Sequence, residues 1–77
     1  MELNEFVKLF ADQFDDIDPS EIEAGTAYHD LDDWSSLIAL SVLNMVEKKC
    51  GVRGLTFDEL KSSTTVEDVY NIVQNKK

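Results

Sequence analysis

The chain has 77 residues, of which 43% are hydrophobic, and its 16 acidic and 7 basic side chains give a formal net charge of −9. A chain this short forms a single domain, residues 1–77, and buries only about 60% of the surface of its unfolded form, which leaves little room for an enclosed active site. Nucleic acids and anionic membranes bind clustered Lys and Arg, so the charge argues against both as partners and favours basic proteins.

The negative charge lies almost entirely in the first half of the chain. Residues 1–34 hold eleven acidic side chains and the single base Lys8, whereas residues 35–77 hold five acidic and six basic side chains. On composition alone, acidic residues that only keep a small protein soluble are the simpler explanation, but such residues would be spread more evenly. The distribution therefore favours an acidic surface that meets a basic partner.

The first predicted element is an amphipathic helix, because apolar residues recur at helical spacing at Leu3, Phe6, Val7, Phe10, Ala11 and Phe14. The acidic residues from Asp15 onward and the pair Asp18-Pro19 end it. Residues 16–34 then form a long connection. Regular apolar anchors indicate that this connection packs against the bundle: Ile17, Ile22, Tyr28 and Leu31.

Three more helices are predicted after the connection. The second covers about residues 35–50 and ends at Gly51, since glycine is common just past a helix end. Capping-box patterns that begin at Thr56 and at Thr65 open a short third helix, which extends through Leu60, and a last helix. No alternating strand pattern appears, so the chain is predicted to be all-α, a small four-helix bundle of three longer helices and one short helix.

The start of the second helix carries the candidate functional residues. Ser36 lies in the first turn, where free N–H groups and the positive end of the helix dipole stabilise an attached anion such as a phosphodiester. Serine at a helix start is, however, more often only a cap. Leu37 and Leu40 fall on the polar side of the helix, and although a single exposed leucine needs no explanation, two beside an acidic loop favour a partner surface.

The order of these elements, together with three short motifs, matches the pattern of a known family. Leu31 takes the place of a loop leucine, Ser36-Leu37 that of a Ser-Leu pair that opens the second helix, and Thr65-Val66 that of a Thr-Val pair that opens the last one. With these motifs, and with its amphipathic first helix and long acidic connection, essentially the whole chain resembles the acyl carrier protein family.

The resemblance implies that Ser36 accepts a covalent 4′-phosphopantetheine arm from coenzyme A, in a magnesium-dependent reaction run by a separate phosphopantetheinyl transferase, the holo-acyl-carrier-protein synthase. The arm then carries acyl groups as thioesters between acyl-transferring and chain-elongating enzymes of fatty acid or related lipid or polyketide biosynthesis. The carrier itself is not an enzyme and is expected to be a monomer. The residues expected to contact the basic docking surfaces of these enzymes are Asp32, Asp33, Leu37 and Leu40.

Two residues depart from the family's Asp-Ser-Leu motif. Ser35 stands in place of the motif aspartate, which family members use to meet the synthase, and Trp34 replaces a smaller residue. Asp32 and Asp33 lie close enough in sequence to substitute for the missing charge. Two alternatives remain: a carrier of aminoacyl or peptidyl groups in a dedicated pathway, and an acidic helical interaction domain that carries no prosthetic group.

The sequence offers no catalytic or metal-binding set. Cys50 is the only cysteine and His29 the only histidine, so no disulfide and no cysteine-based zinc site are expected. Neither residue comes with the supporting motifs of a nucleophile and its base. No signal-peptide pattern and no apolar run of spanning length are present, and a reduced, cytoplasmic setting is therefore expected.

Overall fold

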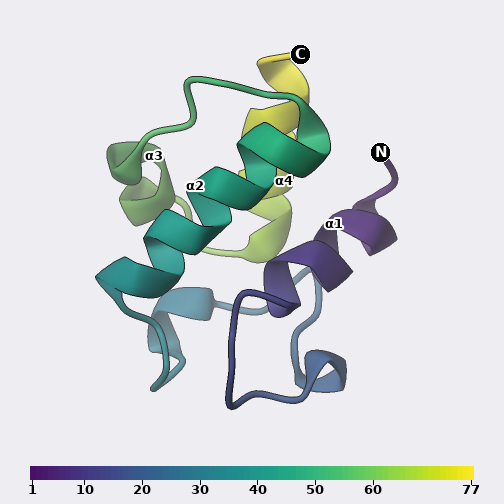
Figure 1. The fold of residues 1–77 in the computed structure, drawn as a ribbon. Helices are drawn as coiled ribbons and strands as arrows, with labels where there is room; N and C mark the ends of the chain where they lie inside the picture. Colours follow the sequence, from purple (N-terminus) through teal and green to yellow (C-terminus); the bar gives the residue numbers. More distant parts are fainter.

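The structure of the chain is a computed structural model that describes residues 1–77. It contains four α-helices. They are α1 (Leu3–Ala11), α2 (Ser36–Cys50), α3 (Phe57–Ser62) and α4 (Val66–Asn75), as labelled in Figure 1. The connection between α1 and α2 contains two short 3₁₀ helices, η1 (Pro19–Glu21) and η2 (Tyr28–Asp30). There are no strands, only an isolated bridge between Ala27 and Thr65. The prediction of a small all-α bundle with three longer helices and one short helix is confirmed.

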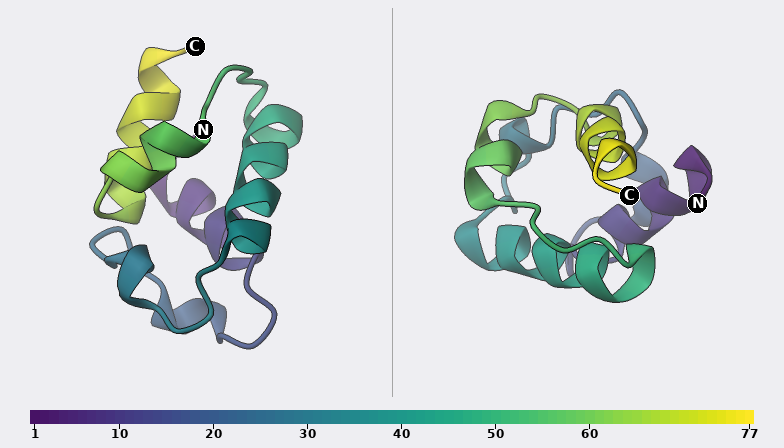
Figure 2. Two further views of the ribbon diagram at one scale, coloured as in Figure 1. Left: turned by 90° about the vertical axis from the view of Figure 1, so that its left-hand side faces the viewer. Right: turned by 90° about the horizontal axis from the view of Figure 1, so that it is seen from above.

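The four helices surround one apolar core. α1 packs against α4 and α2, and α3 packs against α2, an arrangement that Figure 2 shows from the side and from above. Each helix contributes from the face that its sequence periodicity predicts, and the connection adds two more side chains. The largest fully buried side chains are Tyr28, Phe6, Phe10, Leu60, Val42, Val46, Val66, Val69 and Val73.

α1 is shorter than the apolar pattern of the sequence suggests. It ends at Ala11, after which the N–H groups of Gln13 and Phe14 donate to carbonyls three residues back, at 3.2 and 3.1 Å. The side chain of Gln13 also donates to the carbonyl of Leu9 at 2.9 Å and so satisfies one of the free acceptors at the helix end. Phe14 nevertheless remains buried, because the turn continues in a helix-like path and keeps this side chain on the side that faces the core.

The long connection is packed down, as its apolar anchors predict. Ile22 and Tyr28 are buried in the core. The N–H groups of Val66 and Glu67, in the first turn of α4, donate to the carbonyls of Thr26 and Ala24 at 3.3 and 2.9 Å. The connection therefore satisfies donors that the start of α4 would otherwise leave free.

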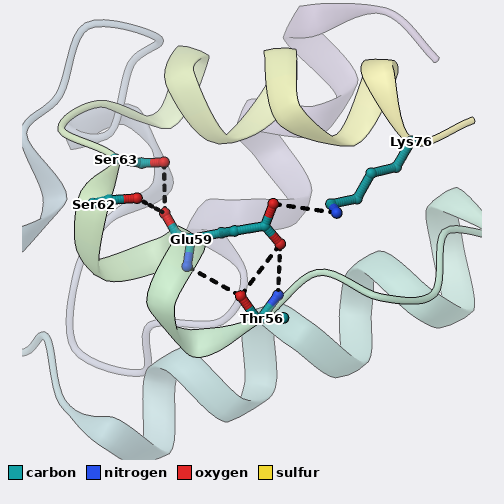
Figure 3. A network of polar contacts seen from close by, with 5 residues as sticks. All are labelled: Thr56, Glu59, Ser62, Ser63 and Lys76. Carbon is teal, nitrogen blue, oxygen red and sulfur yellow. Dashed lines mark hydrogen bonds and ion pairs between the residues drawn. The ribbon is translucent and has the colours of Figure 1, made fainter.

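The helix ends follow the predicted capping residues. Gly51 adopts the left-handed conformation (φ 69°) that ends α2. Thr56 with Glu59 and Thr65 with Asp68 form complete capping boxes at α3 and α4. Figure 3 shows the first of these, in which one oxygen of Glu59 accepts from the N–H of Thr56 at 3.0 Å and the other pairs with Lys76 at 3.2 Å. Glu59 thereby ties α3 to the C-terminal end of α4.

Candidate functional site

The candidate site lies where the connection turns into α2, at the lower left of Figure 1. Ser35 is the N-cap, with extended backbone angles, and its hydroxyl oxygen accepts from the N–H of Ile38 at 3.3 Å. Ser36 is the first helical residue and is exposed, and its hydroxyl takes part in none of the side-chain hydrogen bonds of the structure. Of the two adjacent serines, only Ser36 has a hydroxyl without a hydrogen-bond partner.

The backbone at the start of α2 remains open to an anion. The first turn of this helix contains no acidic side chain, unlike the first turns of α3 and α4. The N–H of Ile38 is taken by Ser35 and that of Ala39 by the carbonyl of Ser35 at 2.9 Å, and the N–H groups before them have no intrahelical acceptor. A negative group on Ser36 would thus meet the positive end of a 15-residue helix.

A small pocket of about 70 Å³ opens beside Ser36. It lies between the start of α2 and the short helix α3, and four of its seven lining residues are hydrophobic. The lining consists of Trp34, Ser35, Ser36, Ala39, Phe57, Leu60 and Lys61. The sequence pointed to Ser36 but not to the three α3 residues, since their contact with α2 depends on tertiary packing.

Trp34 forms one wall of this pocket and is held by an aromatic cluster. Its ring lies parallel to that of Phe10, with centroids 6.4 Å apart, and within 4.7 Å of Tyr28 and 5.3 Å of His29. Phe14 adds a fourth contact at 6.3 Å. Trp34 therefore anchors the connection directly before the two serines.

Leu60 of α3 forms another wall of the pocket, and its carbonyl is bound by two side chains of the connection. The hydroxyl of Tyr28 donates to it at 2.5 Å, and Nε2 of His29 donates to it at 2.8 Å. Burial raises the pKa of Tyr28 to about 12, so the phenol stays a protonated donor across the physiological range. The sequence showed His29 only as a lone surface histidine, because its acceptor lies 31 residues away.

Exposed apolar side chains surround the site. Leu37 is 76% exposed and Leu40 is 47% exposed, so both lie outside the core as the helical periodicity indicated. Phe57 of α3 is 44% exposed and also lines the pocket. The sequence pattern does not predict this position, because it depends on the packing of α3 against α2. The contact of these residues with partners stays a prediction.

The acidic residues before the serines are free of ion pairs. Asp32 is exposed and Asp33 is half-buried, and the two ion pairs of the structure join Arg53 to Glu47 and Lys76 to Glu59. Both carboxylates therefore remain available to a basic partner.

A second, larger groove of about 330 Å³ lies between α1 and α2. Its lining is mostly polar and includes neither serine: Leu9, Asp12, Gln13, Ser41, Asn44, Met45, Lys48 and Lys49. Nowhere do three or more His, Cys, Asp or Glu side chains gather in a way that would hold a metal ion. None of the helices has the length and apolar character needed to cross a membrane.

No family model, no curated protein and no solved structure matches this chain. Its function is therefore inferred from its own residues.

Proposed function

We propose that this chain is an acyl carrier, in which Ser36 bears a 4′-phosphopantetheine arm and passes acyl groups between the enzymes of fatty acid or related lipid or polyketide biosynthesis. The observation that carries the proposal is the state of Ser36. Its hydroxyl is exposed and unbonded at the open N-terminus of α2, while the neighbouring Ser35 already serves as the helix cap.

The residues around Ser36 fit the attachment of such an arm. A base of the transferase would take the proton of the Ser36 hydroxyl, and Oγ would bond to the pantetheine-side phosphorus of the diphosphate of coenzyme A. The P–O bond between that phosphorus and the adenosine bisphosphate half would break, and this half would leave. The free N–H groups of the first turn stabilise the resulting phosphodiester. The arm supplies a thiol that holds acyl groups as thioesters, and the carrier itself contributes position rather than catalysis.

The surroundings of Ser36 also suit a succession of partner enzymes. Leu37 and Leu40 present apolar contact area next to the attachment point. Asp32 and Asp33 precede it and attract a basic docking surface, as expected for the separate phosphopantetheinyl transferase. Complementary charge mainly speeds the encounter, so different enzymes with basic surfaces can use the same short patch.

The intact mass of the chain tests this function. The chain is incubated with coenzyme A, magnesium and a broad-specificity phosphopantetheinyl transferase, and a gain of one arm per chain is expected. The Ser36→Ala variant should gain nothing. An unchanged mass of the parent chain would favour the alternative, an acidic interaction domain without a prosthetic group.

A further inference from the structure

We propose that the pocket beside Ser36 admits only a short acyl group, of about two to four carbons, and that longer chains stay outside the bundle. The inference rests on the proposed function, because the acyl group has to be carried on Ser36. It concerns the class of cargo, which the identity of the attachment residue leaves open.

The size and lining of the pocket set this limit. Its volume is about 70 Å³, about half of the 150 Å³ that a dry apolar cavity offers to one benzene molecule. The side chains of Trp34, Ala39, Phe57 and Leu60 give it an apolar interior. Since Ser36 lines the same pocket, a flexible arm attached there can fold back and place the end of a short aliphatic group inside.

The wall formed by Trp34 resists widening. The indole contacts four other rings, and three of them, Phe10, Phe14 and Tyr28, are almost completely buried. Rotating the indole to admit a longer chain would break these contacts and open a void beside the core.

The wall formed by Leu60 is held by hydrogen bonds as well as by packing. Leu60 is 1% exposed, and its carbonyl accepts from Tyr28 and His29, which also contact Trp34. The adjacent Glu59 binds Lys76, the residue that follows α4, as drawn in Figure 3. Because Tyr28 and His29 touch both walls, the walls cannot separate without losing several contacts at once.

A series of acyl groups of increasing length tests this limit. The transferase is supplied with acetyl-, butyryl-, octanoyl- or hexadecanoyl-coenzyme A, and each product is compared with the unacylated arm. The readouts are the NMR signal of the Trp34 indole N–H and the unfolding midpoint Tm. We expect acetyl and butyryl to shift the indole signal and to raise Tm. Octanoyl and hexadecanoyl should leave both readouts at the values of the unacylated arm, because these chains stay outside the pocket.

Two results would overturn the inference. An indole shift and a Tm that keep rising from butyryl to hexadecanoyl would mean that the bundle encloses the longer chain, since each buried methylene adds stability. An indole signal that responds to none of the acyl groups would mean that the pocket stays empty. Both results require a loaded chain, whereas failure to load at all would contradict the proposed function itself.

A variant with a wider pocket tests whether the pocket volume sets the limit on acyl length. Phe57 is 44% exposed, so Phe57→Ala widens the pocket with little loss of core packing, and the response should extend to octanoyl. Ile72→Ala removes a partly exposed apolar side chain of α4 that neither lines the pocket nor belongs to the proposed partner surface, and the response should still stop at butyryl. An unchanged length profile in Phe57→Ala would show that the pocket does not set the limit.

Discussion

The two adjacent serines at the start of α2 have different environments. Ser35 stabilises the helix as its N-cap, whereas Ser36 makes no side-chain hydrogen bond. Ser35 accepts a hydrogen bond from the N–H of Ile38, whereas the hydroxyl of Ser36 accepts none. Capping serines stabilise a helix through that bond, and a serine at the next position does not.

Ser35→Ala should therefore lower the stability of the folded chain by about 0.5–2 kcal/mol, the usual cost of a lost N-cap. Ser36→Ala should leave stability nearly unchanged. Urea unfolding of both variants, followed by circular dichroism, provides the comparison. An equal loss in the two variants would show that Ser36 also supports the helix.

The exposed leucines of α2 should contribute little to the fold. Leu37→Ala and Leu40→Ala should each change the free energy of unfolding by less than about 1 kcal/mol, because these side chains are 76% and 47% exposed. Leu60→Ala, at a 1% exposed position, should cost about 2–5 kcal/mol. A large loss of stability in Leu40→Ala would place this side chain in the core and remove it from the partner surface.

The helix ends that depend on residues nearby in the sequence could be predicted from the sequence. Those that depend on distant residues could not. Thr56 and Thr65 each find their capping partner three residues later, so the sequence alone identifies both helix starts. The early end of α1 and the anchoring of α3 depend on contacts with distant segments. The hydrogen bond from His29 to the carbonyl of Leu60 is an example of such a distant contact, and no local sequence pattern predicts it.

The difference between local and distant contacts also explains how much of the site could be predicted from the sequence. Ser36 and Leu37 form a contiguous motif at a helix start, and their exposure follows from the helical period. Phe57 and Lys61 join Ser36 only because α3 packs against the start of α2. The sequence therefore predicts the position of Ser36 at the exposed start of α2 but not the pocket beside it.

The short helix α3 should show a characteristic response to acid. Desolvation raises the pKa of Glu59, but the bonds from the Thr56 N–H and from Lys76 outweigh it and hold this pKa below its usual value of 4.5. The folded state thus binds this proton less readily than the unfolded state. Its contribution to stability is complete above the unfolded pKa and is lost as the pH falls through the lowered folded value.

Glu59→Gln should accordingly be less stable than the parent at pH 7, by no more than about 1 kcal/mol for a pair that is still partly exposed to solvent. The difference should shrink as the pH is lowered below about 4.5. Urea unfolding between neutral and acid pH measures it. Glu47→Gln removes the exposed ion pair with Arg53 and serves as the control, with little effect at any pH. A constant difference for Glu59→Gln would mean that its carboxylate charge does not stabilise α3.

Over the whole chain, the charge is distributed unevenly. Residues 1–34 carry a net charge of −10, from eleven acids and one base, and residues 35–77 carry +1, from five acids and six bases. Acidic side chains in the first half repel one another in the compact state. Raising the ionic strength from about 0.01 to 0.15 M shortens the Debye length from about 30 to 8 Å. The Tm of the chain should therefore rise with salt over this range, and a Tm that falls would indicate that attractive pairs dominate.

Charge near Ser36 should speed the encounter with the transferase. Asp32→Asn combined with Asp33→Asn should slow association at low salt and leave maximal turnover nearly unchanged, because exposed charges act mainly on the encounter. Stopped-flow association rates across a salt series measure the effect. The control, Asp15→Asn with Asp16→Asn, removes the same charge from another exposed pair of the connection. If both pairs slow association equally, the total charge matters and the position beside Ser36 does not.

The location of the arm tests the central claim most directly. The chain is loaded by a broad-specificity phosphopantetheinyl transferase, digested, and mapped by tandem mass spectrometry, in parallel with the Ser35→Ala and Ser36→Ala variants. We expect one arm, on Ser36, in the parent and in Ser35→Ala, and none in Ser36→Ala. An arm on Ser35 or on any other residue, or a chain that is never modified, would contradict it.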